Sequence, residues 1–164
     1  MKNIKEYNLD ELKQELISLG EKGYRAEQIF KWLYVEKVKS FDDMTNLSLE
    51  LREKLKQNYT MCNFEILSKQ ESSDGTKKYL FDVLDGNAIE TVLMQYHHGK
   101  TICVSSQIGC KMGCKFCAST GIAFVRGLTS GEIVEQILAV EQDIGEHISN
   151  IVFMGIGEPF DNYD

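Results

Sequence analysis

Three cysteines, Cys110, Cys114 and Cys117, lie in one glycine-rich stretch with the spacing C-x3-C-x2-C. Gly109 and Gly113 place no side chain in the way, so the backbone can curl and bring three sulfurs to one point. Three thiolates are a soft donor set that suits an iron–sulfur cluster, zinc or Cu(I). A cluster of four irons held by three cysteines keeps one iron open, where a small molecule can bind and react. This stretch is the first candidate for chemistry.

Zinc and a disulfide framework are the alternatives for these thiols. Zinc usually takes four ligands, and His97, His98 or Cys103 is available as the fourth. Disulfide frameworks are typical of secreted chains, and nothing in this sequence marks export. A buried structural role suits a single cysteine, but three thiols flanked by Lys111 and Lys115 make poor core composition. The composition of the stretch favours the cluster.

The bulk composition is that of an ordinary globular chain. At 164 residues, with 43% hydrophobic and 26% charged residues, it allows one domain or two small ones. No apolar run is long enough to span a membrane, and the N-terminus lacks a signal-peptide core. These features predict a cytoplasmic chain with no membrane partner. The net charge of −7 argues against an RNA partner on composition alone, although clusters such as Lys77 with Lys78 leave room for a basic patch.

Apolar residues at helical spacing predict a small helical unit at the start of the chain. Asn8 and Glu11 have the spacing of a capping box and begin the first helix. A second helix is expected over residues 25–36, and a third after Ser48. No residue in this part proves a functional role by itself.

The hydrophobic period changes from helical to alternating near Phe64, which predicts antiparallel strands. Asp-Gly pairs at 74–75 and 85–86 are hairpin signals between these strands. The strand expected over residues 88–96 carries Glu90 on the side of its apolar residues. A carboxylate there is costly unless it is exposed, paired or functional. The residues alone favour an edge-strand glutamate that faces water.

A βαβ unit is expected around the cysteine stretch. A strand over residues 101–107 leads into it, a helix with a capping box at Thr129 follows, and a buried strand over 149–154 completes the unit. The apolar stripe of the helix consists of Ile133, Val134, Ile137, Leu138 and Val140. The two strands should be parallel, with a right-handed crossover. Ligands of such sheets collect beyond the carboxyl ends of the strands, so the cysteine loop and segment 155–159 should open on one edge. This segment lacks G-x-G-x-x-G, which makes a dinucleotide-binding fold a weak alternative.

Three blocks of sequence, in this order, carry a resemblance to a known family. They are residues 89–92 (IETV), 103–110 (CVSSQIGC) and 153–159 (FMGIGEP). Together with C-x3-C-x2-C and Phe116 before its last cysteine, they resemble the RlmN/Cfr family of radical S-adenosyl-L-methionine (SAM) methyltransferases. Pro159, at the end of the last block, favours the RlmN branch.

The resemblance implies an α/β fold in three parts. Residues 1–60 would be a small N-terminal helical domain associated with RNA recognition, and residues 61–100 a short antiparallel β extension. Residues 101–164 would be the first βαβ unit of a partial (β/α)6 radical SAM barrel. Because each βα unit needs some thirty residues, the barrel is truncated here, and the chain resembles an N-terminal fragment.

The resemblance also implies roles for individual residues. The three cysteines of the motif would hold a 4Fe-4S cluster whose open iron chelates SAM. Phe116, Gly157 and Glu158 would contact SAM, because a carboxylate beside flexible backbone suits its ammonium group. Glu90 would be the proton acceptor, and Cys103 would help release the covalent protein–RNA adduct.

The implied reaction is methylation of C2 of adenosine in 23S rRNA and tRNA through a methyl-cysteine intermediate, with an electron donor such as flavodoxin. The methyl-carrying cysteine of the family lies beyond residue 164, so this chain alone is predicted to be inactive. Two other hypotheses stay open. One is a non-catalytic zinc- or RNA-binding module, and the other is a different radical SAM enzyme that shares only the cysteine loop.

Overall fold

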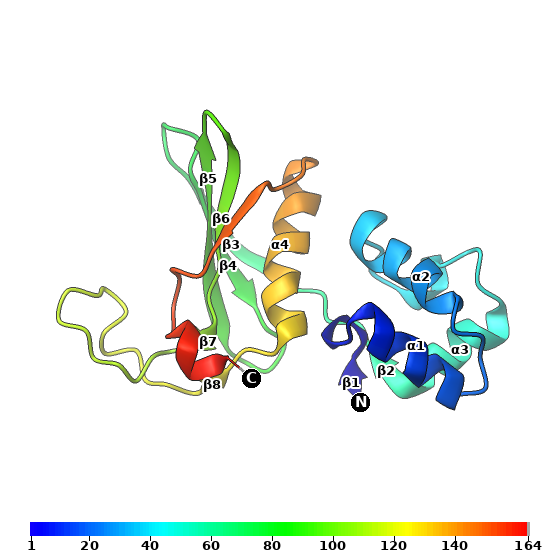
Figure 1. Cartoon of the computed structure of the whole chain (residues 1–164). Helices are drawn as coiled ribbons and strands as arrows, with labels where there is room; N and C mark the ends of the chain where they lie inside the picture. Colours follow the sequence, from blue (N-terminus) through cyan, green and yellow to red (C-terminus); the bar gives the residue numbers. More distant parts are fainter. Residues whose placement is uncertain (164) are drawn as a thin grey trace. The chain divides into compact units, whose positions relative to one another are not determined.

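The computed structural model describes residues 1–163 and forms two compact units, Met1–Asn63 and Phe64–Asp164. The first unit is helical, and the second is built around a five-stranded sheet with a long helix against it (Figure 1). The mixed α/β composition predicted from the sequence is confirmed. The division into three domains stays a prediction.

The first unit consists of short helices and one two-stranded pairing. Its elements are β1 (Lys2–Asn3), η1 (Ile4–Glu6), α1 (Leu9–Ser18), α2 (Arg25–Phe30), η2 (Lys31–Val35), η3 (Phe41–Asp43), α3 (Leu49–Asn58) and β2 (Tyr59–Thr60). Strands β1 and β2 pair in parallel. The helices enclose an apolar core that includes Leu12, Leu16, Ile29, Leu33 and Leu55.

Local capping explains where these helices begin. The Asn8 side chain accepts from the Glu11 backbone N–H at 2.9 Å, and the Glu11 carboxylate accepts from the Asn8 N–H at 2.8 Å. Ser48 accepts from the Leu51 N–H and so begins α3. Both starts were predicted from residue type. The second helix continues from α2 into a π-helical turn, η2, within the range expected.

The sheet of the second unit has the strand order β3-β4-β5-β6-β9. These strands are β3 (Glu65–Glu71), β4 (Lys77–Asp82), β5 (Ala88–Tyr96), β6 (Gly99–Cys103) and β9 (Asn150–Val152). Neighbouring strands are antiparallel, except that β6 and β9 pair in parallel. In the sequence, helix α4 (Ser130–Ile144) lies between β6 and β9. A small ribbon of β7 (Gln107–Ile108) and β8 (Arg126–Gly127) flanks the cysteine loop, and η4 (Pro159–Asn162) follows the glycine-rich segment.

The predicted hairpins and the parallel pairing are confirmed, and two placements are wrong. Gly75 and Gly86 take positive φ in the two Asp-Gly turns, which only glycine adopts cheaply. Strand β5 lies in the middle of the sheet, so Glu90 is not on an edge strand. Strand β9 forms an edge, and Ile151 within it is exposed, so this strand is not buried. An apolar run of this length does not distinguish a buried strand from an edge strand.

Helix α4 begins and ends as the sequence predicts, at the Thr129 capping box and at Gly145 with φ +68°. Its buried face differs from the expected apolar stripe, because it includes four polar residues. These are Glu132, Glu135, Gln136 and Glu141. Glu132 binds Arg126, the Glu135 carboxylate accepts from the Phe64 N–H at 3.1 Å, and the Glu141 carboxylate accepts from the Ile148 N–H at 2.8 Å. Each buried carboxylate thus has a hydrogen-bond donor, which offsets the cost of its burial.

Candidate functional site

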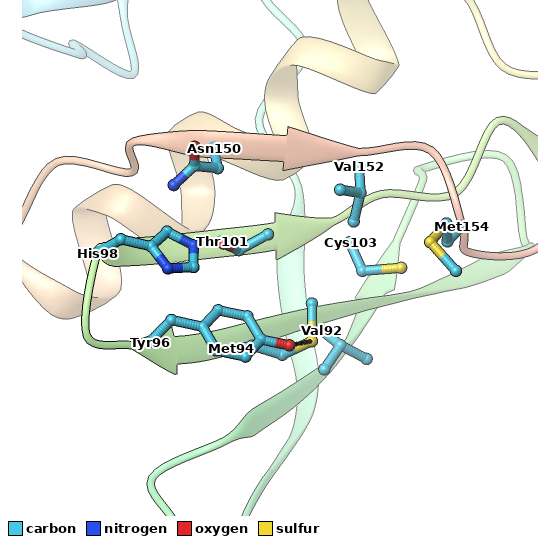
Figure 2. Close-up of a pocket in the computed structure, with 9 residues that line it drawn as sticks. All are labelled: Val92, Met94, Tyr96, His98, Thr101, Cys103, Asn150, Val152 and Met154. Carbon is cyan, nitrogen blue, oxygen red and sulfur yellow. Dashed lines mark hydrogen bonds between the residues drawn. The ribbon is translucent and has the colours of Figure 1, made fainter.

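One face of the sheet forms a hollow next to the end of β6 (Figure 2). Its volume is about 610 Å³. Alternate residues of β5, β6 and β9 point into it from one side, as the pleat of a strand requires. The lining residues are Val92, Met94, Tyr96, His98, Thr101, Cys103, Asn150, Val152 and Met154. Helix α4 contacts the opposite face, where Thr91 donates to Gln136. The hollow is mainly apolar, with one thiol.

Cys103 supplies the thiol of this hollow. It is the last residue of β6, and its sulfur lies among the side chains of Val92, Val152 and Met154 (Figure 2). Burial raises the pKa of the Cys103 thiol, and a hydrogen bond from the Met154 backbone offsets part of that rise. The thiol is therefore held in its protonated, weakly nucleophilic form.

Glu90 lies on the same face of the sheet as Cys103. It precedes Val92 by two residues, and Val92 is paired with Cys103 across β5 and β6. The Glu90 carboxylate is 3.0 Å from Lys78 Nζ, and its side chain is 45% exposed. Its backbone oxygen accepts from the Ser105 hydroxyl at 2.6 Å. The structure thus brings Glu90 and Cys103 to one face, with the carboxylate paired and half-exposed.

The loop that carries the three cysteines extends from the end of β7 to β8 (Figure 1). Gly109 has φ +72°, and a Cβ built on it would lie 1.9 Å from the Ala123 carbonyl oxygen, so only glycine fits there. Cys110 is half-buried, Cys114 and Cys117 are exposed, and all three thiols are free. Three free thiols on one loop could ligate three of the four irons of a 4Fe-4S cluster.

The same loop does not gather its sulfurs in this conformation. Within residues 1–163, no three Cys, His, Asp or Glu side chains are arranged to bind a metal. The convergence that the sequence predicts is absent here, and the ligand assignment stays a prediction. Of the three residues suggested as a fourth zinc ligand, His98 and Cys103 line the hollow of the sheet, where His98 stacks on Tyr96, and the His97 ring contacts the His98 ring edge-on. The side chain of Phe116, next to Cys117 in the loop, is 94% exposed.

The glycine-rich segment after β9 packs on the segment after β6. The Gly155 N–H donates to the Val104 carbonyl at 3.1 Å, and the Ile156 N–H donates to the Ser105 hydroxyl at 3.1 Å. Gly157 has φ +110°, and a Cβ on it would lie 2.7 Å from Ser106 Oγ, so the close approach needs glycine. Segment 155–159 therefore lies at the same sheet edge as the residues that lead into the cysteine loop. That the cysteine loop itself opens on this edge stays a prediction.

Glu158 lies at the end of this packed segment. Its carboxylate accepts from the Phe160 N–H at 3.0 Å and so begins η4. Its own backbone N–H donates to the Gln107 side chain at 3.0 Å. Nearby, Ser106 Oγ is buried without a hydrogen-bond partner among the described residues. Burying a hydroxyl without a hydrogen-bond partner costs free energy. The Ser106 hydroxyl lies beside Gly157, in the segment predicted to contact SAM.

Several polar residues that organise this region received no role from the sequence. Gln136 of α4 is fully buried, and its Oε1 accepts from the Ser105 N–H at 2.9 Å and from the Thr91 hydroxyl at 2.7 Å. Its Nε2 donates to the Ser105 carbonyl at 2.9 Å. The sequence signal that could have revealed this role is the position of Gln136, three residues after Ile133 and four before Val140, which places a polar residue on the inner side of the helix.

Comparison with known proteins gives matches over the whole chain. Residues 2–61 match the family described as the ribosomal RNA large subunit methyltransferase N-terminal domain. The chain is 53% identical over 165 residues to a probable dual-specificity RNA methyltransferase RlmN from Clostridium novyi (strain NT), covering 100% of this chain and 48% of that relative. The chain belongs to the RlmN family. The similarity covers both the helical unit and the sheet.

Two further matches support the assignment of this chain to the RlmN family. The probable dual-specificity RNA methyltransferase RlmN of Bacillus subtilis (strain 168) is 50% identical, over 99% of this chain and 46% of its own length. The crystal structure of a radical SAM methyltransferase from Sphaerobacter thermophilus matches with a TM-score of 0.90 at 40% identity, over 99% of this chain and 49% of that one. The chain spans about half the length of these relatives. Within residues 1–163, no helix is both long and apolar enough to cross a membrane.

Proposed function

We propose that this chain is the N-terminal part of a radical SAM methyltransferase that methylates C2 of adenosine in 23S rRNA and tRNA. The observation that carries the proposal is the packing of segment 155–159 on the segment that leads from β6 into the cysteine loop. In a chain of the RlmN family, this arrangement supplies thiol ligands and a carboxylate at one sheet edge. The rest of the fold would be a partial (β/α)6 barrel that begins with β6, α4 and β9.

The cysteine loop would hold the metal group of this reaction. Cys110, Cys114 and Cys117 would ligate a 4Fe-4S cluster, and the chemistry that a bound cluster supplies is one-electron cleavage of SAM at the open iron. To hold a cluster, the loop would have to bring together its three thiols, which are not gathered in the conformation described here. An electron donor such as flavodoxin would act as partner, in the cytoplasm and without a membrane.

The remaining site residues would position SAM and handle protons. Gly157, whose backbone packs closely on Ser106 and Gln107, would contact SAM through its main chain, and the Glu158 carboxylate would accept hydrogen bonds from the ammonium group of SAM. Phe116, exposed beside the last cysteine of the loop, would cover SAM once the loop has closed. Glu90 would accept a proton from the methylated adenosine, and Cys103, on the same face, would resolve the covalent adduct.

The methyl-carrying cysteine would belong to the part of the family protein that residues 1–164 do not include. We therefore expect the 164-residue chain to leave RNA unmethylated while still binding a cluster. Robust methyl transfer by this chain would contradict that expectation. A non-catalytic zinc-binding module is the second candidate, because three free thiols also suit zinc.

Anaerobic reconstitution separates these candidates. The 164-residue chain is loaded with iron and sulfide, desalted and assayed for iron, sulfide, zinc and visible absorbance. We expect iron and sulfide at the ratio of a 4Fe-4S cluster, with absorbance that dithionite bleaches. Cys114→Ala should lose this absorbance, whereas Cys62→Ala, a control in the other unit, should retain it. Stoichiometric zinc without iron binding would overturn the radical SAM assignment.

A further inference from the structure

The side-chain amide of Gln107 connects the two segments of the proposed site. Gln107 is the first residue of β7, only 1% exposed, and three positions before Cys110. Its Oε1 accepts from the Glu158 backbone N–H at 3.0 Å. Its Nε2 donates to Asp161 Oδ2 at 2.9 Å. One buried amide therefore holds both ends of the turn from Glu158 to Asp161.

The Asp161 carboxylate extends this connection into the cysteine loop. The Oδ2 atom that accepts from Gln107 also lies 2.9 Å from Lys111 Nζ. Lys111 stands between Cys110 and Cys114, and its ammonium group lies 5.2 Å from the centre of the Phe124 ring on the far side of the loop. The Lys111–Asp161 pair is partly exposed and contributes little by itself.

Sterics around Gly157 explain why Gln107 sets the position of the turn. A Cβ on Gly157 would lie 2.7 Å from the Cβ of Gln107. The backbone at Gly157 thus lies against the stem of the same side chain whose amide binds the next residue. A displacement of Gln107 moves the backbone of Glu158 directly. Other contacts of this region, such as Asn162 to the carbonyls of Ser106 and Leu128, do not touch Glu158.

We infer that Gln107 is a positioning residue for the SAM site, because it fixes the backbone at Glu158, the residue whose carboxylate is proposed to bind SAM. The inference rests on the proposed function for the identity of the ligand. Gln107 itself does not contact SAM. It acts through the Glu158 backbone and, by way of Asp161, through Lys111 between two of the cysteines. Loss of its amide should weaken SAM binding without unfolding the sheet.

Hydrogen–deuterium exchange on the metal-free 164-residue chain tests the positioning step. Gln107→Leu keeps the size of the side chain and removes both hydrogen bonds. We expect the Glu158 amide to exchange about tenfold faster, as the loss of a buried hydrogen bond predicts. Amides of β4 and β5 should keep their exchange rates. Gln95→Leu, which changes an exposed glutamine on β5, is the matched control and should alter none of these rates at Glu158.

SAM binding to the cluster-loaded chain, measured by equilibrium dialysis, tests the consequence. We expect Gln107→Leu to raise the Kd for SAM about tenfold and Gln95→Leu to leave it unchanged. Asp161→Ala removes the contacts of this carboxylate with Gln107 and Lys111 but keeps the hydrogen bond from the Glu158 N–H to Gln107. It should raise the Kd about threefold, and it tests the same link in a variant that keeps the buried Gln107 side chain.

The outcomes separate the two proposals. Normal SAM binding and unchanged Glu158 exchange in Gln107→Leu would overturn the positioning role while the proposed function stands. If the unsubstituted, iron-loaded chain binds no SAM, the proposed function fails, and the ligand named here fails with it. If Glu158 exchange accelerates but the Kd does not move, Gln107 is only a structural anchor, and the inference is wrong.

Discussion

At the scale of single residues, Cys103 shows how a strand face controls a thiol. It sits in an apolar hollow, and burial raises its pKa. Since the thiolate is the nucleophile, the protonated thiol reacts slowly near neutral pH. It reacts faster only when a neighbouring group lowers its pKa or a base removes its proton. A group that resolves an adduct late in a reaction benefits from this restraint. Glu90, on the same face, is the carboxylate that the family resemblance implies as the proton acceptor.

The raised pKa of Cys103 predicts a shifted pH profile for alkylation. The rate with iodoacetamide should rise at a higher pH than for an unstructured thiol, whose pKa is about 8.5. At pH 7.5 we expect Cys103 to react several-fold more slowly than the same peptide after denaturation. Mass spectrometry of the peptide that carries Cys103 measures both rates. A midpoint at or below that of the denatured chain would contradict the prediction.

The raised pKa of Cys103 also predicts how the free energy of unfolding depends on pH. Its folded-state pKa lies above its unfolded value, so its protonated form favours the folded chain below the unfolded pKa. This contribution is lost as the pH rises through the folded pKa. The unfolding free energy should therefore fall less steeply above pH 8.5 in Cys103→Ser than in the unsubstituted chain.

Glu90 gives the second residue-scale prediction, which rests on the proposed function. In the full-length family protein, Glu90→Gln should keep SAM cleavage and lower RNA methylation by about 10²-fold or more, because only the proton-transfer step loses its base. Glu71→Gln is the matched control, since Glu71 is also a strand carboxylate paired with a lysine, at 3.7 Å from Lys77. Unimpaired methylation by Glu90→Gln, or loss of SAM cleavage with it, would remove Glu90 from the proposed role.

At the scale of elements, local signals predicted most of what positions the site. The capping boxes and the Asp-Gly turns follow from residues close together in the chain. The parallel pairing of β6 with β9 follows from the order strand, helix, strand. The polar inner face of α4 follows from neither. Gln136 pairs with Ser105, 31 positions away, and Glu135 pairs with Phe64, 71 positions away. Periodicity records which side of a helix is apolar, but it does not record which distant donor satisfies a buried carboxylate.

The candidate site also combines features that the sequence predicted with features that it did not. Residue types and spacing predicted the cysteine trio as ligands, because ligand chemistry depends on side chains that are close together in sequence, and the resemblance implied the role of Glu158. The link from Gln107 through Asp161 to Lys111 was not predictable, since it requires the turn after β9 to fold back on β7. The edge position of β9 was also missed, because sheet order depends on pairing across the fold.

Gln136 supplies the element-scale prediction. Gln136→Leu should destabilise the chain by about 2–4 kcal/mol, because it leaves the Ser105 N–H and the Thr91 hydroxyl buried without their acceptor. Urea unfolding followed by circular dichroism measures this loss. Gln14→Leu, the same change at an exposed position of helix α1, is the control and should cost less than about 0.5 kcal/mol. Equal effects from the two variants would show that the Gln136 hydrogen bonds contribute little.

At the scale of the whole sheet, the two edge strands differ in chemistry. Strand β3 carries Glu65, Lys69 and Glu71, charges that discourage pairing with another strand. Strand β9 and the residues after it are apolar and exposed, including Ile151, Phe153 and Met154. An adjacent hollow of about 650 Å³ is lined by Leu128, Thr129, Ser130, Ile133, Phe153, Pro159, Phe160, Asn162 and Tyr163. Apolar surface of this extent is typical of a surface that contacts further protein.

The β9 edge therefore predicts that the isolated chain associates with itself. Its sedimentation coefficient should rise with concentration in the micromolar range, because the unpaired backbone of β9 and its apolar neighbours can pair with a second copy. Ile151→Lys places a charge on this edge and should shift the association to at least about tenfold higher concentration. Val35→Lys, which changes an exposed valine of the helical unit, should leave it unchanged. Sedimentation that does not depend on concentration, or equal effects of the two lysines, would show that β9 is not the surface through which the chain associates.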